Sequence, residues 1–165
     1  MEQNAIHTIE MEFQRRMVAL RTEEVRAKKE HSLHVQDLEV QKAELRLAAE
    51  AKIRKLRREC SEAVLDRKDI LNIALQSMAN DTERLNAHHA CQVDVLEFRS
   101  GCDDDVDDVR NKLSSDMTSI RRELTSANKL LAEQMEEIAT RREQLHGWRY
   151  KEMMKLNQEN TQDNE

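Results

Sequence analysis

The stretch that decides the fold of this chain runs from Leu113 to Trp148 and reads LSSDMTSIRRELTSANKLLAEQMEEIATRREQLHGW. Its apolar residues recur at alternating steps of four and three, the heptad spacing of a coiled-coil seam, with polar breaks at Gln134 and Arg141. The stretch therefore predicts a helix that packs against another helix. The predicted partner-binding seam consists of Leu113, Met117, Ile120, Leu124, Ala127, Leu131, Ile138, Leu145 and Trp148.

The seam continues towards the N-terminus, but its frame drifts. It runs back to Leu71, moves by one residue to include Ile53 and Leu56, and moves by one more to include Phe13 and Leu20. A drift of two residues over about a hundred means a repeat slightly longer than seven, which is typical of a gently wound rod. We expect an all-α chain whose long extended helix forms a coiled coil with partner chains, roughly 220 Å long if ~150 residues form one helix.

The composition of the 165 residues agrees with a rod, because 36% are charged, none is proline and only two are glycine. A compact domain needs more turn residues and large side chains, whereas disorder lacks regular apolar spacing. The mixed charges, with a net charge of -6, do not favour nucleic acid as a partner. The longest apolar run, Met17 to Leu20, is too short for a bilayer span, so we expect a cytoplasmic protein with no membrane partner.

Two places are candidates for an interruption of the helix. Asn80-Asp81-Thr82-Glu83 resembles a helix cap with an acidic first turn, and Ser100-Gly101 is followed by Cys102-Asp103-Asp104-Asp105. The second is the stronger candidate, because glycine costs about 1 kcal/mol inside a helix and carboxylates suit a helix start. The expected segments are therefore an N-terminal coil over residues 1–100, a C-terminal coil over 101–156 and a frayed polar tail over 157–165.

Residues with metal-binding or catalytic chemistry do not form a recognisable site. His31 and His34 share a helical face but lack a third ligand. The acidic run that begins at Asp103 would place Asp108 and Ser114 where a calcium loop requires glycine and glutamate, so a solvated acidic helix start is expected. Three widely spaced cysteines are expected to be reduced thiols. We expect neither a metal, nor a cofactor, nor enzymatic activity.

One segment is strongly basic. It offers a possible electrostatic contact through Lys52, Arg54, Lys55, Arg57 and Arg58. Its candidate partners are the acidic residues 103–108 of a neighbouring chain, an acidic filament surface such as tubulin, or only water.

Charged residues also occupy core positions of the seam. In a parallel homodimer each of them would face its own copy, so a hetero-oligomer of different coiled-coil proteins is favoured over a homodimer. These residues are Glu24, Lys52, Arg67, Lys68, Arg99, Arg110 and Arg141.

The first 60 residues carry a resemblance to a known family. Residues 9–28 read IEMEFQRRMVALRTEEVRAK, and they are followed by Lys42-Ala43-Glu44-Leu45 and Arg57-Arg58-Glu59-Cys60. This segment resembles the small coiled-coil subunit twelve of the nexin-dynein regulatory complex of motile cilia. The resemblance implies a non-catalytic structural rod of the cytoskeleton, in the axoneme of a cilium or flagellum, that links doublet microtubules and regulates dynein-driven motility. The alternative is a cytosolic coiled-coil adaptor or tether at a centrosome or vesicle.

Overall fold

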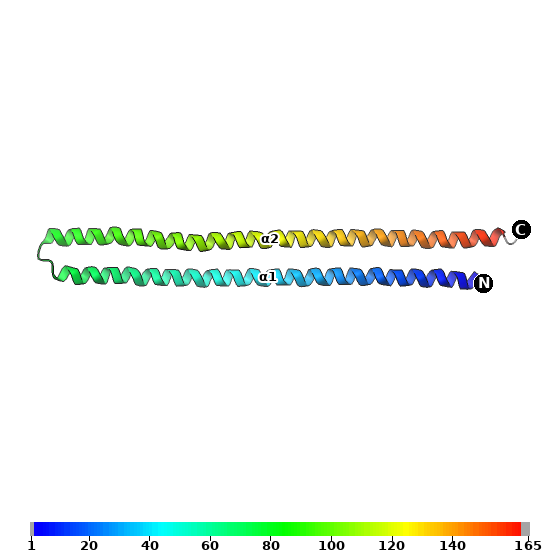
Figure 1. The fold of residues 1–165 in the computed structure, drawn as a ribbon, viewed down its shortest axis with the longest axis horizontal. Helices are drawn as coiled ribbons and strands as arrows, with labels where there is room; N and C mark the ends of the chain where they lie inside the picture. Colours follow the sequence, from blue (N-terminus) through cyan, green and yellow to red (C-terminus); the bar gives the residue numbers. More distant parts are fainter. Residues whose placement is uncertain (1, 163–165) are drawn as a thin grey trace. The chain divides into compact units, whose positions relative to one another are not determined.

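The structure is a computed structural model that describes residues 2–162. Within this range the chain forms two helices, α1 over Glu2–Gln76 and α2 over Asp81–Gln162, and no strand (Figure 1). The predicted all-α class is therefore confirmed. Neither helix contains an apolar stretch that is long enough to cross a membrane, within the residues described.

A short turn at residues 77–80 separates the two helices. The end of α1 tightens, because Ser77 N and Met78 N donate to the carbonyls of Ala74 and Leu75 over 3.2 and 3.3 Å. Asn80 caps α2, since its Oδ1 accepts a 2.8 Å hydrogen bond from Thr82 N. Asp81 and Glu83 place acidic side chains in the first turn of α2, as the helix dipole favours. The break between the helices therefore lies at the weaker of the two candidate positions.

The chain divides into two compact units, each of which contains a segment of both helices. Unit 1 comprises Met1–Leu38 and Arg122–Glu165, and unit 2 comprises Glu39–Arg121 with the turn. Within each unit the α1 and α2 segments lie side by side and run in opposite directions (Figure 1). The single extended helix that the sequence predicted is wrong, because the chain reverses direction in unit 2 and each helix packs against the other.

The core of unit 1 is a narrow strip between its two helical segments. Phe13, Leu20 and Leu145 are 5%, 6% and 6% exposed and pack together, with Met17 and Trp148 against them. Further buried residues are Ala27, Leu38 and Ile138. The buried positions of the α1 segment in unit 1 are seven or eleven residues apart, which keeps them on one face of a nearly straight helix.

The core of unit 2 has the same construction with smaller side chains. Val64 on α1 and Val95, Val106 and Ile120 on α2 are buried. Arg67 Nε donates to Asp94 Oδ2 over 2.8 Å, and its guanidinium carbon lies 3.9 Å from the centre of the Phe98 ring. Apolar contact, an ion pair and a cation–π contact therefore join the same two helices in this unit.

Helix α2 continues through the position where a break was predicted. Residues 98–108 are all helical. Val95 before Gly101 and Val106 after it are both buried. This burial offsets the helix cost of Gly101, so Ser100-Gly101 does not interrupt α2. The acidic side chains between residues 103 and 108 consequently lie inside α2 and not at a helix start. Residues 157–162 of the predicted polar tail also continue α2, and 163–165 lie outside the described residues.

The glycine in the middle of α2 generates a stability prediction. A Cβ added at Gly101 would meet no atom within 4 Å, and the residue has a helical backbone. We expect Gly101→Ala to stabilise the protein by up to about 1 kcal/mol and to raise its melting temperature, measured by circular dichroism. Gly147→Ala is the matched control, because its site is equally open. A lower melting temperature for Gly101→Ala alone would indicate a hinge at this residue.

The narrow core of unit 1 generates a second prediction. Leu20 is 6% exposed and Leu33 on the same helix is 52% exposed. Leu20→Ala should therefore lower the free energy of unfolding by about 2 kcal/mol or more, while Leu33→Ala should change it by less than about 0.5 kcal/mol. Urea unfolding of dilute protein measures both. Equal effects of the two substitutions would contradict the assignment of the inner face.

Candidate interaction surfaces

The seam predicted on α2 lies on the face that packs against α1. All nine of its residues, from Leu113 to Trp148, are buried or half-buried within the chain itself. Leu113, Met117 and Ile120 belong to unit 2, and the remaining six to unit 1. The α1 segment of the same chain thus covers the surface that was expected to bind another chain.

Charged side chains join the two helices along this seam in unit 1. Arg149 Nη2 lies 2.6 Å from Glu10 Oε1, Arg141 pairs with Glu23, and Arg142 pairs with Glu24. In each pair the acid belongs to α1 and the arginine to α2. The sequence predicted that a different chain supplies the charge opposite Arg141, but Glu23 of the same chain supplies it.

Aromatic side chains also join the two helices of unit 1, between residues 13–16 of α1 and 146–149 of α2. The guanidinium carbons of Arg16 and Arg149 each lie 4.7 Å from a ring centre, Arg16 above Trp148 and Arg149 above Phe13. The Phe13 and His146 rings are 5.2 Å apart. Trp148, expected in the partner-binding seam, therefore packs within its own chain, where Arg16 and apolar neighbours contact its indole.

Among the acids of these ion pairs, Glu24 has a clearly lowered pKa. Its carboxylate accepts hydrogen bonds from Lys28 on α1 and Arg142 on α2. The hydrogen bond from Lys28, followed by that from Arg142, lowers the pKa of Glu24 from 4.5 to about 2. Hydrogen bonds to the charged form stabilise it, so the ionised carboxylate favours the paired helices.

The basic segment on α1 lies in unit 2, and its side chains are free to meet another molecule. Lys52, Arg54, Lys55, Arg57 and Arg58 are all exposed. Lys55 Nζ lies 3.8 Å from Glu59 Oε1 one turn away, a pair that contributes little at a solvated surface. The structure therefore places the whole cluster on the surface of unit 2.

Two neighbouring cysteines show that the basic segment of α1 lies near the acidic run of α2. The neighbouring Cys60 thiol, followed by burial and the charges of Asp105 and Asp103, raises the pKa of Cys102 to about 11. Because Cys60 follows the basic cluster and Cys102 precedes Asp103, the two charged segments lie at the same level of unit 2. The sequence expected such proximity only between neighbouring chains. Cys60 and Cys102 form no disulfide in the part of the chain that the structure describes.

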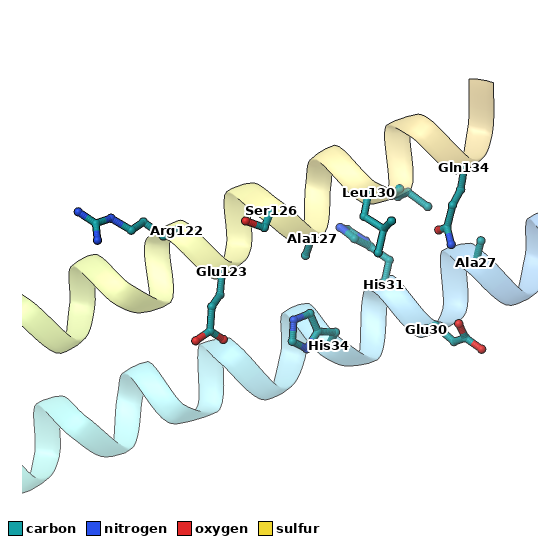
Figure 2. A pocket seen from close by; sticks show the side chains of 11 residues that line it. Ala27, Glu30, His31, His34, Arg122, Glu123, Ser126, Ala127, Leu130 and Gln134 are labelled. Atoms are coloured by element: carbon teal, nitrogen blue, oxygen red, sulfur yellow. The ribbon is translucent and has the colours of Figure 1, made fainter. Parts of the chain in front are cut away.

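The two histidines on one helical face line a shallow groove of about 480 Å³ in unit 1 (Figure 2). Ala27, Ser126 and Ala127 leave this space because their side chains are small. His31 Nε2 lies 2.8 Å from Asn128 Oδ1 and so is engaged across the two helices, while His34 is exposed. Among the described residues no group of three histidine, cysteine or acidic side chains is placed to hold a metal ion.

A surface that the sequence reasoning missed lies on the face of α1 opposite the core. Met11, Val18, Val25 and Leu33 are between 52% and 62% exposed. They follow one another at steps of seven, seven and eight residues, a signal that is visible in the sequence. The sequence prediction followed the more regular seam in the C-terminal half and did not include this row. We call this row, with the polar residues between its members, the outer stripe of α1.

The pairing of Glu24 predicts how stability depends on pH. Because its pKa is depressed in the folded chain, its contribution is present above pH 4.5 and is lost as the pH falls towards about 2. Glu24→Gln should lower stability at neutral pH and flatten the decline between these values, measured by chemical unfolding at several pH values. Glu50→Gln, at an exposed position, is the control. An unchanged pH profile in Glu24→Gln would contradict the assigned pairing.

Comparisons with known proteins add no relative to these observations. No protein-family model matches the chain. Neither a curated protein nor a solved structure is significantly similar to it. The function is therefore inferred from the chain's own residues and surfaces.

Proposed function

We propose that this protein is a non-catalytic structural subunit of a cytoskeletal assembly. The observation that carries the proposal is the division of apolar residues between two faces of α1. One row, with Phe13 and Leu20, is buried against α2, whereas the outer stripe, with Val18 and Val25, stays exposed. A regular apolar stripe on a helix that is already paired is typical of a building element onto which further helices pack.

The assembly we propose is the axoneme of a cilium or flagellum, with the protein acting in a nexin-dynein regulatory complex type link that regulates motility. The resemblance of the first 60 residues supports this placement. The partners would be other coiled-coil proteins in a hetero-oligomer. The exposed cluster from Lys52 to Arg58 supports an additional contact with the acidic surface of tubulin.

The proposal predicts where the protein is found and what its loss changes. A tagged copy should lie along the axoneme and remain there after detergent extraction. Its depletion should change beat waveform or cohesion between doublets, because a structural link transmits force, while dynein ATPase activity per motor stays near normal. Microscopy of extracted cells and waveform analysis provide the measurements.

The control is a soluble tagged protein of similar size, which extraction should remove. A pool at vesicles or centrosomes that detergent releases, together with unchanged swimming, would favour the adaptor or tether and contradict the axonemal placement. Replacing Arg54 and Arg58 by Glu isolates the tubulin contact, because both side chains are exposed and their substitution leaves the helical pair intact.

A further inference from the structure

The outer stripe of α1 in unit 1 combines apolar and basic residues. Between Met11, Val18, Val25 and Leu33 lie Arg15, Thr22 and Lys29, at steps of four or three, and all seven are exposed. Arg26 is exposed at the edge of the same face. The acids of this α1 segment that pair with α2, Glu10, Glu23 and Glu24, lie on the inner side. Glu12 pairs with Arg15 over 2.9 Å from beside the stripe, but the row from Met11 to Leu33 itself carries two cations and no acid, so the outer stripe is basic.

The outer face of α2 in the same unit has the opposite character. Ala132, Glu136, Ala139, Glu143 and Gly147 follow one another at steps of four or three, and all are exposed. A Cβ added at Gly147 would meet open space. Small residues thus alternate with carboxylates on this face, and Tyr150, 67% exposed, ends it. We call these residues the outer face of α2.

The signs of charge on both helices reverse from the inner to the outer side of unit 1. Inside, α1 contributes the acids and α2 the arginines of three ion pairs. Outside, α1 presents Arg15 and Lys29, and α2 presents Glu136 and Glu143. The basic outer surface of α1 is consequently complementary in charge to the acidic outer surface of α2.

We propose that the outer stripe of α1 docks on the outer face of α2 of a second copy of this chain. Large side chains such as Val18 and Val25 would then meet alanine and glycine, and basic residues would meet carboxylates. The two like pairings are disfavoured, since α1 on α1 brings Arg15 and Lys29 together and α2 on α2 brings the glutamates together. Charge complementarity therefore selects the head-to-tail arrangement.

Each copy keeps one free surface in such a contact, because the docking surfaces lie on different helices. A heterologous contact of this kind extends into open chains unless its rotation closes a ring. This self-association goes beyond the proposed function: both use the outer stripe, but self-association is measured on the purified chain alone. It predicts a weak, salt-sensitive interaction, since the contact is a narrow stripe with charges at its border.

An anionic lipid surface is a less suitable occupant of the outer stripe. Helices that lie in a membrane interface present a broad apolar face, often with Trp or Phe. The outer stripe has one apolar residue in seven or eight and no aromatic side chain. A coiled-coil seam has two apolar residues in seven, so this row can form only a narrow contact with another helix, in which the neighbouring charges take part.

Charge exchange between the two surfaces tests the proposal with purified full-length protein. Sedimentation velocity of the wild type should reveal concentration-dependent association that high salt weakens. Arg15→Glu with Lys29→Glu should weaken self-association at least ~10-fold, and so should Glu136→Lys with Glu143→Lys. Mixing these two variants should restore association, because the altered α1 of one complements the altered α2 of the other.

Controls separate this contact from other causes. Arg54→Glu with Arg58→Glu changes the charge equally in unit 2 and should associate like the wild type, and circular dichroism should confirm the helical content of every variant. A wild type that remains monomeric at its highest soluble concentration overturns the proposal. Failure of the mixed variants to associate also overturns it, as does flotation with phosphatidylserine vesicles without self-association. None of these results bears on axonemal location.

Discussion

Apolar contact between α1 and α2, bordered by acids of α1 and arginines of α2, is the interaction on which the rest of unit 1 depends. Phe13, Leu20 and Leu145 exclude water from the strip between the helices. Glu23 and Arg141 then meet at its edge, where their charges are only partly hydrated. Without the apolar strip these ions would be ordinary surface pairs of little consequence, and without the ions the strip would be bordered by unpaired charge.

The short turn explains why α1, and not another chain, covers the α2 seam. A linker of a few residues holds two segments at an effective concentration of roughly millimolar, which a separate chain seldom reaches in a cell. Asn80 reinforces the reversal by capping α2. Intramolecular pairing consequently gives Glu24, Arg67 and Arg141 a partner of opposite charge on the other helix, whereas in a homodimer they would face their own copies. Partners must then be recognised by the surfaces that this pairing leaves outside.

Those outer surfaces relate the fold to the proposed function. A helical pair buries one apolar row and has no deep interior, so the groove lined by His31 and His34 is shallow and open along the helices. The features available for recognition are exposed rows and clusters, such as the outer stripe of α1 and the basic segment in unit 2. A molecule of this kind acts by binding along its surface and by setting the spacing of what it binds.

The sequence by itself determined the helical class, the inner face of α2 and the cap at Asn80, since heptad spacing, absent proline and capping chemistry act over short distances in the chain. The apolar spacing of the outer stripe of α1 is also present in the sequence, but it is less regular than the α2 seam. It did not determine which helix faces the seam, because a heptad pattern is the same for a partner within the chain and one outside it. The tertiary structure decided that Glu23 and Glu24 meet Arg141 and Arg142. It also decided that Gly101 stays helical, because burial of Val95 and Val106 outweighs the local preference of one glycine.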